Sequence, residues 1–197
     1  MNARPYNTGL AQAEVALRAQ LAEITHAASE RGVVFAHAIG TPFTAGQAKI
    51  ISRCACIYCE LPWVSGWALF HQRAGVDPVS SYADYIKAVA ELLAEFRKPA
   101  FIVCSKRSAT ILSQPPLRPI GLNGGRAWLA VAYVEGGPDL PLRTPASTEE
   151  LLGWLAGRFP SVYDFGCGYG NALRRFSYFV GSDIDKKCLD YIARELL

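Results

Sequence analysis

The chain has 197 residues, a formal net charge of +3 at pH 7 and a hydrophobic content of 51%. This length suits one α/β domain and is short for two, and the apolar content is typical of a parallel sheet covered on both faces. No stretch reaches ~18 uninterrupted apolar residues and the first residues lack the apolar run of a signal peptide, so we expect no membrane span and a cytoplasmic location.

Apolar runs and helical spacings alternate along the chain. Apolar residues spaced by three and four predict a helix that ends near Gly32. Ser80 or Ser81 and Pro145 or Ser147 are expected at the beginnings of two later helices. The strands are predicted at residues 33–39, 50–58, 100–104, 163–165 and 178–183, and the helices at residues 8–31, 64–72, 81–98, 144–159 and from 184 onward.

Two strand candidates follow a proline-rich stretch. Pro115, Pro116 and Pro119 exclude regular structure there, and Asn123-Gly124-Gly125 predicts the turn of a hairpin over residues 118–137. With the alternating strands and helices, this predicts a doubly wound, Rossmann-like α/β fold with a mostly parallel sheet and an antiparallel hairpin. Ligands of such sheets bind at the carboxyl ends of the strands.

Three of the six cysteines, Cys54, Cys56 and Cys59, share the segment CACIYC. Such spacing raises the possibility of zinc, but side chains alternate along a strand and no second cysteine or histidine pair completes a tetrahedral set. We expect no metal and reduced, buried thiols.

Positive charge is concentrated in the middle of the chain. Between residues 97 and 134 there is no Asp or Glu. Lys106, Arg107, Arg118 and Arg126 are therefore candidates for contacting phosphates, and an ordinary basic loop region is the alternative.

A glycine-rich turn comes near the end of the chain. The segment DFGCGYG places Asp164 before Gly166, Gly168 and Gly170, and Asn171 stands where a dinucleotide-binding motif requires its last glycine. The next predicted strand ends at Asp183, which can bind both hydroxyls of a ribose. A tight strand-to-helix turn without a ligand is the alternative.

These residues resemble the first two motifs of class I S-adenosylmethionine-dependent methyltransferases. The resemblance implies S-adenosyl-L-methionine as cofactor. The glycines, with Cys167, would make room for its methionyl part and ribose, Asp164 would lie near its amino group, and Asp183, followed by Ile184, would hold the ribose.

The position of this loop predicts a circular permutation, because such a fold needs seven strands and only two can follow Pro160. Residues 147–197 would supply the first two strands and residues 1–146 the other five, within one domain. The fourth strand then ends in Glu60-Leu61-Pro62-Trp63. This segment resembles the Asp/Asn-Pro-Pro-aromatic motif of nucleic-acid amino-methyltransferases of the N6-adenine type, whose permuted members also have a segment similar to TPASTEELL before the glycine loop.

The resemblance implies methyl transfer to an exocyclic amine of a base in DNA or RNA. Glu60 and the backbone near Pro62 would orient the amine, Trp63 would stack on the base, and sequence specificity would be low. Because Glu60 and Leu61 depart from the motif, a catalytically degenerate partner subunit in a homo- or hetero-oligomer stays open, as does a small-molecule methyltransferase. A plain strand end with a proline turn is the structural alternative for this motif.

Overall fold

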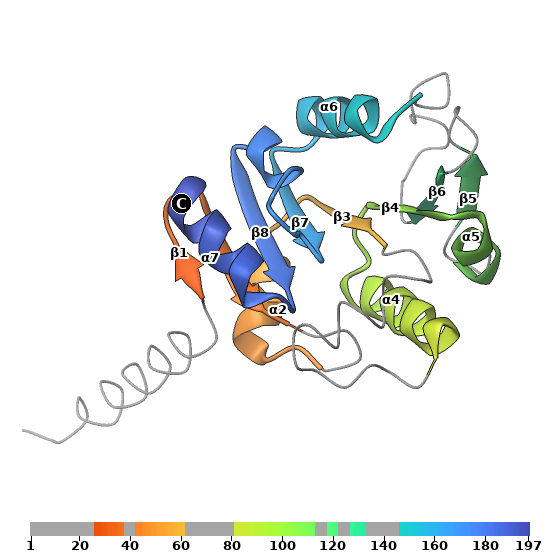
Figure 1. Ribbon diagram of the computed structural model, residues 1–197, viewed down its shortest axis with the longest axis horizontal. Coiled ribbons are helices and arrows are strands. Elements are labelled where there is room, and N and C mark those ends of the chain that lie inside the picture. Colours follow the sequence, from red (N-terminus) through yellow and green to blue (C-terminus); the bar gives the residue numbers. More distant parts are fainter. Residues whose placement is uncertain (1–25, 38–41, 62–80, 113–117, 122–126, 133–145) are drawn as a thin grey trace, which may run out of the picture.

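The computed structural model of the protein describes residues 26–37, 42–61, 81–112, 118–121, 127–132 and 146–197 (Figure 1). The strands are β1 Ala27–Ala28, β2 Gly32–Ala36, β3 Cys56–Glu60, β4 Ala100–Ser105, β5 Arg118–Gly121, β6 Ala127–Ala132, β7 Ser161–Phe165 and β8 Tyr178–Asp183. The helices are α2 Ala45–Ile51, α4 Tyr82–Phe96, α5 Lys106–Leu112, α6 Thr148–Arg158 and α7 Lys186–Glu195, with a 3-10 turn, η1, at Leu173–Arg175.

All eight strands form one sheet, in the order β1-β2-β8-β7-β3-β4-β6-β5. The central strands β2, β8, β7, β3 and β4 are parallel, whereas β1 at one edge and the hairpin β5–β6 at the other are antiparallel to their neighbours. The connections leave β7 and β3 in opposite directions across the sheet. This is a topological switch point, where ligands of doubly wound folds bind.

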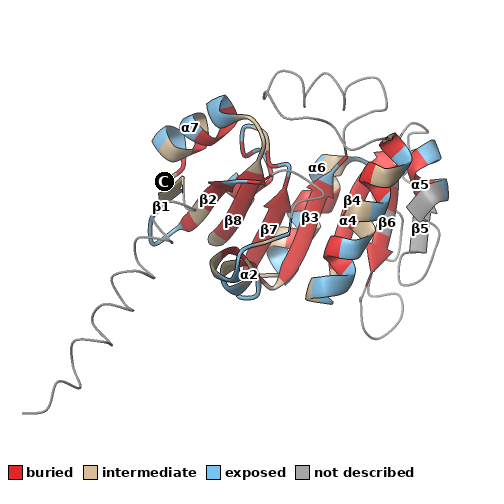
Figure 2. Cartoon of the chain, turned by 90° about the horizontal axis from the view of Figure 1, so that it is seen from below, coloured by how far each residue is buried: buried red, intermediate tan, exposed pale blue. Residues whose placement is uncertain are grey.

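The sheet buries both of its faces (Figure 2). On one face, Ile57, Ile102 and Tyr163 pack with residues of α2 and α4. On the other face, Phe101 and Val162 pack with residues of α6 and α7. The strands are apolar on both sides because helices cover both sides, so the predicted Rossmann-like α/β class and the hairpin are confirmed.

Short polar side chains define where the helices begin. Ser81 and Ser147 accept hydrogen bonds from backbone N–H groups of the first turns of α4 and α6, as predicted. Asp185 does the same for α7. Thr44 and Gln47 form a reciprocal capping box at the start of α2.

Several element predictions are wrong. The first helix does not extend to Gly32, because Ala27 and Ala28 pair with β2 as β1. Ile50 and Ile51 belong to α2 rather than to a strand. The sequence VYDFGCGYGNALRRF is typical of a strand, a glycine-rich turn and the start of a helix, but the turn after β7 leads into η1 and not into an α-helix.

Two further differences concern the basic segment. A helix that the sequence analysis did not predict, α5, begins at Lys106. Pro119 lies within β5, which is at the edge of the described sheet, the position where a strand tolerates proline. The predicted helix at residues 64–72 and the end of the predicted strand at 38–39 lie outside the described residues. Over the described ranges, no helix has both the length and the apolar character needed to cross a membrane.

Candidate functional site

The glycine-rich turn follows β7 at the switch point. Gly166, Gly168 and Gly170 have φ values of 69°, 51° and 75°, in the left-handed region that glycine adopts without strain. The N–H groups of Gly166 and Cys167 donate to the Ser182 carbonyl at 2.8 and 3.0 Å, which ties the turn to β8. The turn is therefore held against β8 by backbone hydrogen bonds.

The three glycines have different surroundings. Among the described residues, a Cβ added to Gly166 or to Gly168 would meet no heavy atom within 4 Å beyond the adjoining residues, whereas one on Gly170 would lie 2.8 Å from Leu196 Cδ1 and 3.1 Å from Ile192 Cγ1. Gly170 thus permits close packing on the end of α7. Gly166 and Gly168 leave open space that a ligand can approach.

Asp183, at the end of β8, is bonded to the turn. Its Oδ2 accepts from the Gly168 N–H and its Oδ1 from the Asp185 N–H, both at 2.8 Å. Burial raises the pKa of this carboxyl group, while these backbone bonds act in the opposite direction. Each oxygen retains a lone pair, so the carboxylate can still accept from a hydroxyl of a ligand.

Asp164 is the most deeply buried carboxyl group of the site, with 3% of its surface exposed. It makes no hydrogen bond or ion pair with the part of the chain that the structure describes. Burial and, next, the negative charges of Asp183 and Glu60 raise its pKa well above the ordinary value. A buried carboxyl group in this position is stabilised by a cation, which would supply the missing positive charge.

Glu60 ends β3, the strand beside β7. Cys59 pairs with Phe165, so Glu60 is level with the first residue of the glycine turn. Alternation places the Glu60 side chain on the same face of the sheet as Tyr58 and Asp164. The Glu60 side chain is exposed. The structure therefore brings Glu60 to the glycine turn.

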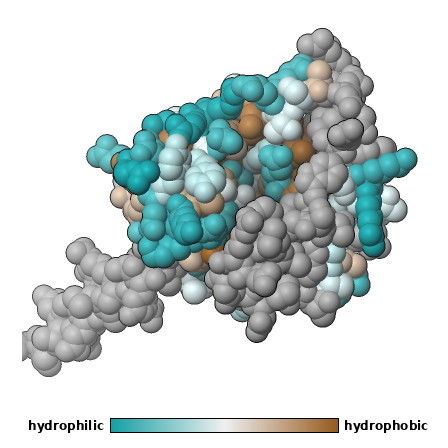
Figure 3. All heavy atoms as spheres, in the orientation of Figure 1, coloured by the Kyte–Doolittle hydropathy of each residue, from teal (hydrophilic) through white to brown (hydrophobic). Residues whose placement is uncertain are grey.

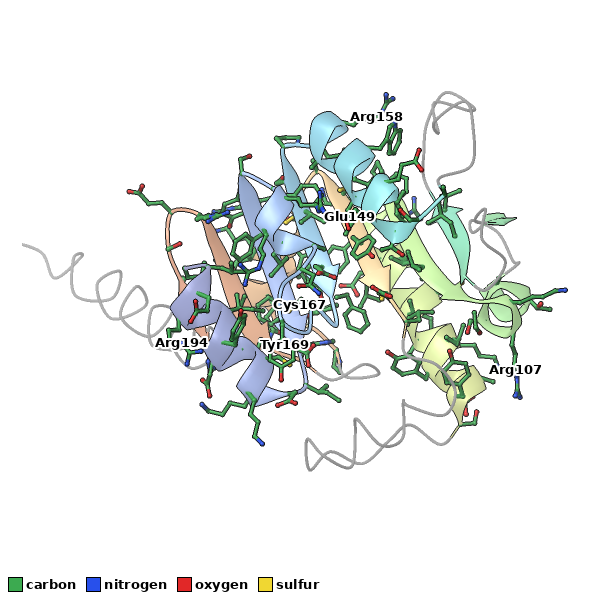
Figure 4. All side chains as sticks on the ribbon, turned by 45° about the horizontal axis from the view of Figure 1, so that its top comes forward. Arg107, Glu149, Arg158, Cys167, Tyr169 and Arg194 are labelled. Atoms are coloured by element: carbon green, nitrogen blue, oxygen red, sulfur yellow. The ribbon has the colours of Figure 1, made fainter. Side chains whose placement is uncertain are left out.

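The remaining predicted residues are only partly described. Pro62, Trp63 and Arg126 lie outside the described residues, and Arg118 lies in β5 with its side chain undescribed. Lys106 and Arg107 are exposed in the first turn of α5, directly after β4. In Figure 4 Arg107 points away from the molecule, whereas Cys167 lies near the centre, at the strand ends. Of the four basic residues predicted to contact phosphates, Lys106 and Arg107 are thus accessible, and the side chains of the other two are not described.

Cys167 and Ile184 flank the turn. Cys167 is 7% exposed and its side chain packs in the core shared with α6 and α7, so only its backbone can face a ligand. Ile184 is partly buried directly after Asp183.

The cysteine segment does not form a metal site in the structure. Cys54 and Cys59 pack on one face of the sheet and Cys56 on the other. All six cysteines are free and buried, and the described residues contain no group of three or more potential metal ligands.

Sequence reasoning missed one feature of the site. Tyr58 lies in the apolar run of β3 and is 2% exposed, as a core residue would be, but its hydroxyl has no hydrogen-bond partner among the described residues. No sequence signal could have identified it, because an aromatic residue in an apolar strand is also typical of a core.

Asp164, Asp183 and Glu60 thus surround a glycine turn with open space at two of its glycines. No described ion pair involves any of the three. Such a site favours a cationic ligand, with room for backbone contact and an acceptor for hydroxyl groups.

Comparisons with known proteins give one weak structural likeness. The sequence matches no protein-family model, and no curated protein sequence matches it significantly. The chain is similar to the solved structure entitled "crystal structure of M1.HpyAVI", with 15% sequence identity and a TM-score of 0.42, covering 83% of this chain and 97% of that one.

Proposed function

We propose that the protein is an S-adenosylmethionine-dependent methyltransferase that transfers the methyl group to an exocyclic amine of a nucleic-acid base, adenine in DNA or RNA. The observation that carries the proposal is the buried Asp164, which has no hydrogen-bond or ion-pair partner among the described residues. It lies beside a glycine turn at which those residues leave open space around Gly166 and Gly168. This cofactor bears an ammonium group, a sulfonium and a ribose diol. The described residues can accommodate a cation and a ligand that approaches the backbone closely, and Asp183 can accept hydrogen bonds from hydroxyl groups.

The order of strands supports the permuted arrangement. When β7 is counted as the first strand, β8 becomes second, β2 third, β3 fourth and β4 fifth. The sheet order then reads 3-2-1-4-5 before the hairpin, which is the order of a dinucleotide-binding fold over its first five strands. On this numbering β7 and β3 are the first and fourth strands. The switch point between them is where the turn and Glu60 meet.

Each residue would have a distinct role in this site. Asp164 would neutralise the positive end of the cofactor, and Asp183 would accept hydrogen bonds from the ribose hydroxyls. Glu60 would accept a hydrogen bond from the amine, which directs the nitrogen lone pair, with Pro62 and Trp63 contributing as in the family motif. The bound cofactor supplies a methyl group activated by its positively charged sulfur. Lys106 and Arg107, with Arg118 and Arg126, would contact phosphates.

Titration calorimetry with S-adenosylmethionine and S-adenosylhomocysteine tests the cofactor assignment. We expect the wild type to bind both and Asp183→Ala to bind each about tenfold or more weakly, because a charge-assisted hydrogen bond is lost. Ser147→Ala is a matched control that weakens the cap of α6 without touching the turn. No detectable heat with the wild type would rule out the proposal.

Transfer of a radiolabelled methyl group to DNA, RNA and free nucleosides tests the substrate. Labelling of a nucleic acid that Glu60→Ala abolishes would support the proposed reaction. Cofactor binding without transfer to any of these substrates would favour a catalytically degenerate partner subunit. The observation that supports this alternative is Glu60, which stands where the family motif has Asp or Asn. Labelling of nucleosides alone would favour a small-molecule methyltransferase.

A further inference from the structure

The Tyr58 hydroxyl is a buried polar group with no hydrogen-bond partner among the described residues. The whole residue is 2% exposed and packs in the core on the α6 and α7 side of the sheet. Burying a hydroxyl group without a partner costs free energy that a phenylalanine at this position would not cost. The tyrosine is therefore poorly explained as a packing residue alone.

The hydroxyl belongs to the site described above. Tyr58 is paired with Asp164 across the parallel strands β3 and β7, so both side chains project from the same face of the sheet. Glu60 follows two residues later on that face. Burial and, next, the negative charges of Asp164 and Glu60 raise the pKa of Tyr58, as expected for a hydroxyl near both carboxyl groups. Tyr58 and Asp164 are therefore neighbours in the sheet, and neither has a hydrogen-bond partner among the described residues.

The surrounding charge selects the ligand group that they can bind. Asp183 and Glu60 would repel a carboxylate or phosphate, and the buried Asp164 is stabilised in its ionised form by a cation, so the missing partner has to be positive and to carry several N–H donors. A tyrosine hydroxyl can accept one such hydrogen bond while its own proton points elsewhere. An ammonium group meets both requirements, since it supplies three donors from one charge.

Resting on the function proposed above, we propose that the Tyr58 hydroxyl accepts a hydrogen bond from the α-ammonium group of S-adenosylmethionine while Asp164 neutralises its charge. Tyr58 is then a cofactor-binding residue. Its hydroxyl, which has no hydrogen-bond partner among the described residues, would gain one from the bound cofactor.

The substitution Tyr58→Phe separates this role from a structural one, because stability and affinity change in opposite directions. Removing an unpartnered hydroxyl leaves no orphaned group, so the free protein should melt at the same temperature or a few degrees higher. Affinity for S-adenosylmethionine should fall about tenfold or more, as expected for a lost hydrogen bond to a charged group.

Tyr163→Phe is the matched control. Tyr163 is also buried in the sheet, but its hydroxyl shares a 2.8 Å hydrogen bond with the Ser182 hydroxyl on the opposite face. Removing the Tyr163 hydroxyl leaves the buried Ser182 hydroxyl without this hydrogen bond, so the variant should melt at a lower temperature. It should bind the cofactor within about twofold of the wild type, because no contact with the ammonium group is removed.

Three cofactor-related compounds identify the group that is recognised. S-adenosylmethionine and its decarboxylated form both keep the ammonium group, whereas 5′-methylthioadenosine lacks it. Calorimetry should show that Tyr58→Phe weakens binding of the first two about equally and of the third by less than about twofold.

Each other result overturns a specific claim. Equal weakening for all three compounds, or a melting temperature well below the wild type, would mean that the hydroxyl acts through the fold. Weakening confined to S-adenosylmethionine with its carboxylate would assign the hydroxyl to that group instead. Wild-type affinity in Tyr58→Phe would overturn the inference alone. Failure of the wild type to bind S-adenosylmethionine would overturn the proposed function with it.

Discussion

Alanine at Gly166 and alanine at Gly170 should have different consequences although both glycines lie in the same turn. Both have φ values near 70°, so each alanine costs ~1–2 kcal/mol in backbone strain. At Gly170 the new methyl group would also lie 2.8 Å from Leu196 and 3.1 Å from Ile192. Overpacking of this kind adds ~1–3 kcal/mol. At Gly166 the methyl group would meet no other described residue within 4 Å beyond its two neighbours in the chain, so no such addition arises.

Thermal melting and calorimetry measure the two effects separately. For a domain of this size ~1 kcal/mol lowers the melting temperature by ~2–4 °C, so Gly170→Ala should melt ~2–12 °C below Gly166→Ala. Gly166→Ala should lose about tenfold or more in affinity for S-adenosylmethionine, because its methyl group occupies the space that a ligand approaches. Equal melting temperatures would refute the packing argument for Gly170. Unchanged affinity in Gly166→Ala would refute the placement of the ligand.

Two further predictions concern charge. The pKa of Asp164 is raised well above its ordinary 3.8. Above about pH 4 the folded protein therefore keeps a proton on Asp164 that the unfolded chain loses. As a result, the free energy of unfolding falls as the pH rises from about 4 through the raised pKa. Asp164→Asn should make this slope shallower in melts between pH 4 and 8 and weaken cofactor binding at pH 8; an unchanged slope would contradict the burial of an unpaired carboxyl group. The double variant Lys106→Ala and Arg107→Ala should reduce the salt dependence of nucleic-acid binding by ~1.4–1.8 in slope, measured by fluorescence anisotropy, and an unchanged slope would exclude phosphate contacts at α5.

Sequence patterns located most elements because their signals are local. The runs that became β4 and β8 are apolar and bounded, and the serine caps of α4 and α6 are read directly from the chain. The position of Asp164 and Asp183 near the glycine turn could also be predicted, because both acidic residues lie at or next to the ends of predicted strands. These features depend on neighbours in sequence.

The errors arose where one apolar run contains two elements. In IISRCACIY the first residues end α2 and the last form β3, and hydrophobicity alone does not divide them. The T-x-x-Q capping box at Thr44 was the signal that could have predicted α2. After β7, the turn itself uses the residues up to Ala172, so little chain is left for a helix before β8 begins at Tyr178.

The sequence could not show that two buried polar side chains lack hydrogen-bond partners among the described residues. Tyr58 and Asp164 are unusual because β3 and β7, which are about 100 residues apart in the chain, pair side by side. Neither residue shows this in its own neighbourhood. By contrast, the side chains over α7 on the face shown in Figure 3 are mainly hydrophilic. Their exposure can be predicted from the helical pattern of the segment itself, without knowing which distant segments pack nearby.

The ends of the chain provide the strongest test of the permuted arrangement. His26, just before β1, lies 2.8 Å from Asp190 of α7 through its Nε2 atom, and Ala27 and Leu197 flank the same apolar core. Strands β8 and β2 are parallel neighbours, and α7 packs its Leu189 and Ile192 into the core that also contains Val34 of β2. Joining Leu197 to Met1 would therefore complete an ordinary strand–helix–strand crossover.

A variant that joins these ends and opens the chain between β6 and α6 should keep the fold. The 25 residues before His26 can span ~80 Å when extended, far more than the connection requires, so closing the ends imposes no strain. We expect cooperative unfolding and cofactor affinity within about threefold of the wild type, because every strand pair and the switch point between β7 and β3 are retained. An insoluble or non-cooperatively unfolding product would show that the order of elements in the natural chain is itself required. The glycine turn and Glu60 would then not belong to a simply rearranged version of a common fold.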